Sequence, residues 1–154
     1  MNTRPTLDYL AATAAQKIVE VIGEEVKNGR EVDAREVENL VTKALGVLQS
    51  QGVNALALFL YSRSGQKTQA HEMKAEERVA TQILACLRSL RDSLEKVDGL
   101  CSNFKQPVKT NNEKERVLQK FADLSEDLDT LLLVRDLYEQ TLIYARYHAK
   151  AASD

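Results

Sequence analysis

Apolar residues recur at three- and four-residue spacing along most of the chain, which is the pattern of amphipathic helices. In the first such segment they are Leu7, Leu10, Ala11, Ala14, Ile18, Val21 and Ile22. Pro5 stands just before this segment, where a helix tolerates proline, and Asn28-Gly29 follows its end. The spacing therefore predicts a first helix over Thr6–Val26.

A second helix is predicted over Ala34–Gln51. Asp33 and Glu36, three residues apart, have the arrangement of a capping box at its start. The apolar face that follows is Val37, Leu40, Val41, Ala44, Leu45 and Leu48. Gly52 comes next, and glycine can end a helix in a left-handed conformation and let the chain turn sharply.

The segment after Gly52 is almost wholly apolar, and Asn54 is the one polar residue from Val53 to Tyr61. A helix that is apolar all round has to be covered on all sides. We therefore expect Val53–Tyr61 to be the central helix and the most buried segment, with amphipathic helices packed about it.

A polar loop is expected over 62–71, and a fourth helix is predicted to start between Ala70 and Glu76 and to run to about Leu100. Its apolar stripe is Val79, Ile83, Cys86, Leu87, Leu90, Leu94 and Val97. The side chains that the same periodicity places on the opposite, outer face are Arg88, Arg91 and Glu95.

A flexible loop is predicted over Cys101–Asn111, which holds a proline and several Asn and Lys residues. After it, apolar residues again keep helical spacing at Val117, Phe121, Leu124, Leu128, Leu131, Tyr138, Leu142 and Ala145. Arg135 is the one break in this spacing. Because Ser125 can cap a new helix, residues 112–151 form either one long helix or two helices that meet near Leu124.

The chain has 154 residues, of which 44% are hydrophobic, and this is the size of one domain with a real core. It holds only 6 Gly and 2 Pro, and so few breakers favour long helices over a sheet with many tight turns. The predicted fold is all-α, a single compact bundle of five or six helices over residues 1–154.

The cysteines, the first residues and the hydropathy all favour a cytoplasmic protein. Cys86 and Cys101 on one helix would lie about 22 Å apart, at about 1.5 Å per residue, and a disulfide needs Cα atoms within about 7 Å. The start of the chain has no signal-peptide core. No run approaches the roughly 18 apolar residues of a membrane span.

No constellation of catalytic residues is evident. Gly46 and Gly52 are isolated glycines and form no phosphate-binding loop. The acidic pairs fall on predicted exposed faces, where a carboxylate has little reason to change its pKa. Two His and two Cys show no zinc spacing, and His148 is typical of a cation at a helix end. We therefore expect no enzymatic activity, no metal and no cofactor.

The formal net charge of −2 gives no general reason to expect nucleic acid, so the local charge has to decide. Acidic residues gather in 20–38 and 123–129. The basic residues that we take as candidate RNA contacts are Arg63, Lys67, Arg88, Arg91, Arg146 and Lys150. Tyr61, Tyr144 and Tyr147 are interleaved with some of them, which suits backbone neutralisation and base stacking. A mixed-charge surface without such a role is the alternative.

Residues 52–63 resemble the small subunit of type III CRISPR effector complexes, the Cmr-type small subunit family. Members carry a helix like Gly-Leu-x-x-Ala-Leu-x-Phe, followed by Ser-Lys or similar. The matching residues are Gly52, Ala55, Leu56 and Phe59, with Val53 in place of the usual leucine and Ser62-Arg63 where Ser-Lys is common. The end of the chain, 146–151, is similar to the basic and aromatic C-terminal helix of the family.

The resemblance implies a non-catalytic subunit that stacks, with further copies of itself, along the inner face of an RNA-guided ribonucleoprotein. There it would line the channel where target RNA pairs with CRISPR RNA. The backbone subunits would cleave the target RNA, and the large subunit would perform the nucleotide signalling. The basic residues would then contact the RNA backbone, which needs charge and no sequence reading.

A helical adaptor or regulator that binds only protein, possibly as a homodimer, explains the bundle and the mixed charge equally well. RNA binding that weakens steeply with salt would separate the two interpretations.

Overall fold

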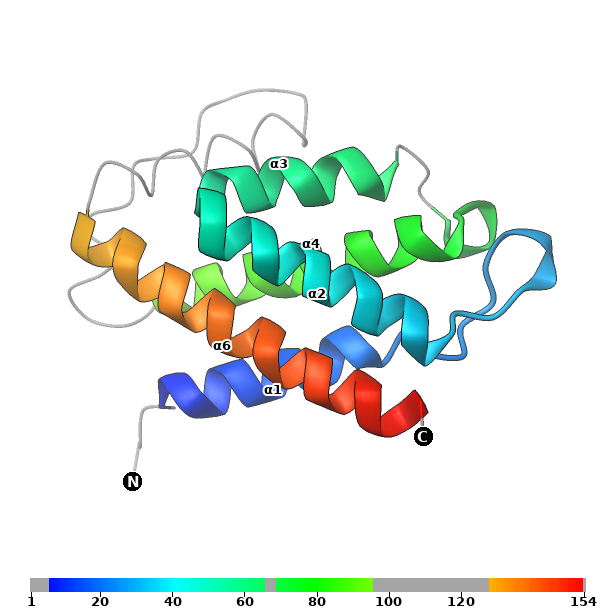
Figure 1. Cartoon of the computed structure of the whole chain (residues 1–154), viewed down its shortest axis with the longest axis horizontal. Coiled ribbons are helices and arrows are strands. Elements are labelled where there is room, and N and C mark those ends of the chain that lie inside the picture. The colour runs from blue at the N-terminus through cyan, green and yellow to red at the C-terminus, as the bar shows by residue number, and fades with distance from the viewer. Residues whose placement is uncertain (1–5, 66–68, 96–127, 154) are drawn as a thin grey trace.

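The computed structural model describes residues 6–65, 69–95 and 128–153 (Figure 1). Within these ranges the chain is all α, as predicted. The α-helices are α1 (Leu7–Val19), α2 (Ala34–Gln51), α3 (Val53–Ser64), α4 (Ala75–Glu95) and α6 (Leu128–Ser153), with short 3-10 helices η1 (Lys27–Gly29) and η2 (Ala70–Glu72). The described residues hold no strand beyond one isolated bridge, between Glu25 and Glu31.

The boundaries of α2 agree with the prediction at both ends. The Asp33 side chain accepts a hydrogen bond from the Arg35 N–H, and the side chain of Glu36 reaches back to the Asp33 N–H, which completes the capping box. At the other end the Gly52 N–H donates to the Leu48 carbonyl over 3.0 Å. Gly52 has a φ of +96°, a conformation that favours glycine and that lets α3 start at once in a new direction.

The helices form a compact bundle in which α4 contacts each of the other described α-helices. α4 packs against α1, α2 and α3, and the Tyr138 hydroxyl of α6 donates to the Leu87 carbonyl over 3.0 Å. α6 runs antiparallel to α2 and also lies along α1 (Figure 1). In α6 the predicted apolar positions Tyr138, Leu142 and Ala145 are buried, as expected.

The prediction that the first helix reaches Val26 is wrong, because α1 ends at Val19. Gly23 then takes a φ of +89°, and the chain folds back on itself through residue 32. The Gly23 N–H donates to the Val32 carbonyl over 2.8 Å, and the Val26 N–H donates to the Arg30 carbonyl over 2.7 Å. The fold-back brings Val26 and Val32 into the core, where each is 2% exposed.

The prediction that Val53–Tyr61 is the central, most buried helix is also wrong. α3 buries one face, formed by Val53, Leu56, Ala57 and Leu60. Leu58 on its other side is 57% exposed, and Phe59 is only partly buried. The reason is that α3 packs against α2 and α4 alone, so that the described helices leave part of its apolar surface uncovered.

Arg91 does not lie on the outer face of α4, contrary to the periodicity argument. Its side chain is 2% exposed, and its Nη2 lies 2.9 Å from the Asp92 carboxylate. Since α4 is covered from several directions, its buried arc is wider than the apolar stripe. The expected loop over 62–71 starts later than predicted, because α3 continues to Ser64 and η2 follows.

Several predictions lie outside the described residues. They are the end of the fourth helix near Leu100, the loop Cys101–Asn111, the break near Leu124 and the placement of Lys67. Cys86 is a free, buried thiol. No helix in the described part of the chain is long and apolar enough to cross a membrane.

Candidate anion-binding site

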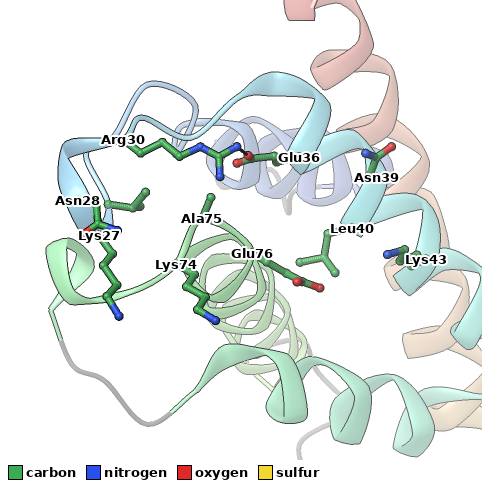
Figure 2. A pocket seen from close by; sticks show the side chains of 11 residues that line it. Lys27, Asn28, Arg30, Glu36, Asn39, Leu40, Lys43, Lys74, Ala75 and Glu76 are labelled. Atoms are coloured by element: carbon green, nitrogen blue, oxygen red, sulfur yellow. Dashed lines mark hydrogen bonds and ion pairs between the residues drawn. The ribbon is translucent and has the colours of Figure 1, made fainter.

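A hollow of about 510 Å³ lies at the end of the bundle where α2 and α4 begin (Figure 2). Its walls come from the fold-back before α2, from the first half of α2 and from the start of α4. We call it the basic hollow, because the charged residues that line it are Lys27, Arg30, Lys43 and Lys74 with Glu36 and Glu76. Leu40 and Val26 add apolar surface.

The fold-back positions Lys27. Asn28 and Gly29 both take left-handed conformations, with φ of +69° and +72°, which closes a tight turn directly after Lys27. The Lys27 N–H donates to the Met73 carbonyl over 2.8 Å, so that this turn is fixed to the chain just before Lys74. As a result Lys27 and Lys74 extend side by side on the same edge of the hollow (Figure 2).

The first turn of α2 carries an ion pair on the hollow's wall. The Arg30 guanidinium pairs with the Glu36 carboxylate, the same side chain that completes the capping box of α2. Two turns further along α2, Lys43 reaches toward the hollow (Figure 2). The positive charge of Arg30 is therefore balanced locally, while the charge of Lys43 is not.

The start of α4 carries the second ion pair. Glu76 pairs with Arg63, which extends from the last turn of α3. The Arg63 guanidinium carbon also lies 4.9 Å above the centre of the Phe59 ring. Among the described residues, Arg63 is thus the candidate RNA contact from the sequence that adjoins the basic hollow.

The basic hollow is lined by more positive than negative side chains. Both of its carboxylates are paired with arginines, whereas Lys27, Lys43 and Lys74 have no carboxylate within 4.0 Å among the described residues. The first N–H groups of α4 add a partial positive charge near Lys74. Such a hollow attracts anions with several oxygen atoms, and phosphate groups above all.

The other candidate RNA contacts do not gather around the basic hollow. Arg146 and Lys150 are exposed on the C-terminal half of α6, and Arg88 is half-buried on α4. Arg91 is buried. The five described residues of the predicted set therefore do not gather around one hollow, and Lys67 lies outside the described residues.

The three lysines of the basic hollow were not among the sequence candidates, because they lie near many acidic residues in the sequence. In the structure two of those acids are engaged elsewhere. Glu24 binds Arg78 of α4 through two hydrogen bonds of 3.1 and 3.2 Å, and Glu36 binds Arg30. The Asn28-Gly29 dipeptide is the signal that would have shown the turn that exposes Lys27.

The described residues hold no group of three or more His, Cys, Asp or Glu side chains that could bind a metal ion. The thiol of Cys86 lies between α1 and α4, away from the basic hollow. Burial raises the pKa of the Cys86 thiol to about 11. No family model, no curated protein and no solved structure matches this chain.

Proposed function

We propose that the protein is a non-catalytic small subunit of a type III CRISPR effector complex and binds the RNA backbone through its basic residues. The observation that carries the proposal is the basic hollow, in which three lysines without carboxylate partners in the described structure converge beside Arg63. The resemblance of residues 52–63 to the Cmr-type small subunits is the reason for proposing a type III CRISPR effector complex as the assembly.

Two residues of the resembling segment have structural roles that support the proposal. Gly52 forms the corner between α2 and α3, which needs its positive φ. The Phe59 ring lies under the Arg63 guanidinium and limits where that side chain can go. The segment therefore directs a basic side chain to the border of the basic hollow.

The proposed mechanism is electrostatic. Lys27, Lys43 and Lys74 would each neutralise a phosphate of the duplex between CRISPR RNA and target RNA, without reading its bases. Each neutralised phosphate adds about −0.9 to the slope of log affinity against log salt. One subunit with about three contacts binds weakly, and several copies joined to the backbone and large subunits bind the same duplex far more firmly.

The structure changes the set of residues in the proposal. Arg63, Lys67, Arg88, Arg146 and Lys150 stay proposed contacts, Lys67 lying outside the described residues, and the three lysines of the basic hollow join them. Arg91 leaves the set, because a side chain that is 2% exposed does not reach a phosphate.

The test is a charge reversal of Lys27, Lys43 and Lys74 to Glu in the assembled complex. Target-RNA affinity should fall, and the salt slope should become shallower by about 2 to 3 units. The matched control is Lys17→Glu, which reverses an exposed lysine on α1, outside the basic hollow. An unchanged affinity and slope with intact assembly would sink the RNA-binding role of the hollow.

The runner-up function is a protein-binding adaptor, and the exposed Leu58 of α3 favours it. An apolar side chain that is 57% exposed suits contact with another subunit. If Leu58→Asp releases the protein from its complex while the lysine variants keep full RNA binding, the adaptor function replaces the proposal.

A further inference from the structure

A second hollow, of about 360 Å³, lies between α1 and α6, outside the basic hollow. We call it the tyrosine hollow, and its lining residues are Asp8, Ala12, Tyr144, Tyr147, His148 and Ala151. The two alanines face each other's helix and leave the space that larger side chains would fill. Figure 1 shows α1 running alongside the C-terminal half of α6, the part of the fold that forms this hollow.

Asp8 is held in the tyrosine hollow by neutral groups only. Its Oδ1 accepts hydrogen bonds from the Tyr144 hydroxyl and from the Gln140 side-chain amide, the latter over 2.8 Å. The Gln140 amide lies 2.9 Å from the Tyr144 hydroxyl, so that the three side chains orient one another. Among the described residues no basic side chain pairs with Asp8, and none donates a side-chain hydrogen bond to its second oxygen, which is the acceptor offered to a ligand.

Tyr147 supplies a flat apolar wall. Its side chain is 67% exposed although it lines the hollow, and a ring of this size is usually covered in a folded protein. An aromatic face beside an oriented hydrogen-bond acceptor suits a flat ligand that carries N–H donors at its edge.

The neighbouring charges decide between a cationic ligand and a nucleotide. Arg146 directly precedes Tyr147, and Lys150 directly precedes Ala151; both are exposed, and neither forms an ion pair within the described part of the chain. They repel a cation that would enter the hollow toward Asp8. They favour instead a neutral ring in the hollow with an anionic group attached, which is the charge arrangement of a nucleotide.

We infer that the tyrosine hollow binds one unpaired guanine base of RNA. The base would stack on Tyr147, donate its N1–H and N2–H together to the second oxygen of Asp8, since Oδ1 already accepts from Tyr144 and Gln140, and direct its phosphate toward Arg146 and Lys150. Guanine alone among the RNA bases presents a ring N–H and an amino group side by side, a pair of donors that can share one carboxylate oxygen. The inference rests on the proposed RNA binding, and it adds a base preference that the basic hollow lacks.

The experiment follows backbone amide chemical shifts of the full chain during titration with nucleoside monophosphates. GMP should shift the amides around Asp8 and Tyr147. IMP, which lacks only the amino group at C2, should bind there about tenfold more weakly, and UMP more weakly still. Tyr147→Ala should weaken GMP binding about 5- to 150-fold, whereas the matched variant Tyr147→Phe keeps the stacking face and should retain it.

Three outcomes would overturn the guanine site. In the first, GMP, IMP and UMP bind equally well; in the second, GMP shifts only the amides of Lys27, Lys43 and Lys74; in the third, argininamide shifts the amides around Asp8 and Tyr147 and GMP does not. The second outcome leaves RNA-backbone binding intact and removes only the base site. If charge reversal of the three lysines leaves RNA binding by the assembled complex unchanged, the proposed function fails. The GMP titration tests the tyrosine hollow separately, because it uses the protein without the complex.

Discussion

α3 and α4 lie side by side in the bundle and are buried to very different extents. α4 packs against α1, α2 and α3, and it receives a hydrogen bond from Tyr138 of α6. Among the described elements, α3 packs mainly against α2 and α4. The burial of a helix is therefore set by how many neighbours reach it, and an apolar sequence does not by itself supply those neighbours.

The difference extends to single side chains. In α4 even the charged Arg91 is 2% exposed, whereas in α3 the apolar Leu58 is 57% exposed. A buried guanidinium needs partners, and Asp92 supplies a carboxylate at 2.9 Å. An exposed leucine needs none, and its cost is only the apolar area left in contact with water.

The strongest test of this comparison truncates one leucine in each helix. Leu87 of α4 is fully buried, so that Leu87→Ala should lower the free energy of unfolding by about 2–5 kcal/mol through lost contacts and a cavity. Leu58→Ala in α3 should cost less than about 1 kcal/mol. Denaturant unfolding followed by circular dichroism measures both, and equal losses would contradict the unequal burial of the two helices.

A smaller effect is expected from the buried arginine of α4. Arg91→Ala should lower the free energy of unfolding by about 2–4 kcal/mol, because it removes buried packing and leaves Asp92 without its partner. The control is Arg146→Ala on the exposed surface of α6, which should change stability by about 0.5 kcal/mol or less. If the two variants are equally stable, Arg91 is not part of the core.

Periodicity and capping residues were sufficient to predict the class of fold and the limits of α2. Both depend on local chemistry: a stripe of apolar residues, the Asp33 and Glu36 box, and the positive φ of Gly52. The ranking of helices by burial depends on packing between segments far apart in the sequence. For this reason Arg91 was predicted to be exposed and is buried, whereas Leu58 was predicted to be buried and is exposed.

The candidate site was predictable only in part. Arg63 was identified, since it ends an apolar helix next to a polar segment. Lys27 and Lys74 were missed, because they become neighbours through the hydrogen bond from the Lys27 N–H to the Met73 carbonyl. Counting charges along the chain does not show which acids are already paired, as Glu24 is with Arg78.

The thiol of α4 should make stability depend on alkaline pH. Burial raises the pKa of Cys86 from 9.0 to about 11, so that the unfolded chain ionises first as pH rises through this range. The free energy of unfolding should therefore fall, by at most about 1.4 kcal/mol per pH unit and roughly 1–3 kcal/mol in all.

Urea unfolding between pH 8 and 11 measures this fall, and Cys86→Ala should make the dependence shallower. Burial also raises the pKa of Tyr138, which lies on α6 against α4, so that a smaller fall with the same sign should remain in the variant. An identical pH dependence in the two proteins would show that Cys86 is not buried as described.

The smallest expected effect concerns the exposed side of α3, where surface contacts take the place of core packing. The Arg63 guanidinium carbon lies 4.9 Å from the centre of the half-buried Phe59 ring, within the range of a cation–π interaction. A double-mutant cycle with Phe59→Leu and Arg63→Met should give a coupling free energy of about 0.5–1 kcal/mol. Arg63 also pairs with Glu76, so a parallel cycle with Arg63→Met and Glu76→Gln measures the ion pair separately. The coupling free energy of the ion pair should fall in high salt, and that of the contact with the ring should change less. Zero coupling between Phe59 and Arg63 would mean that the ring does not direct Arg63, and that the ion pair with Glu76 places its charge beside the basic hollow without help from the ring.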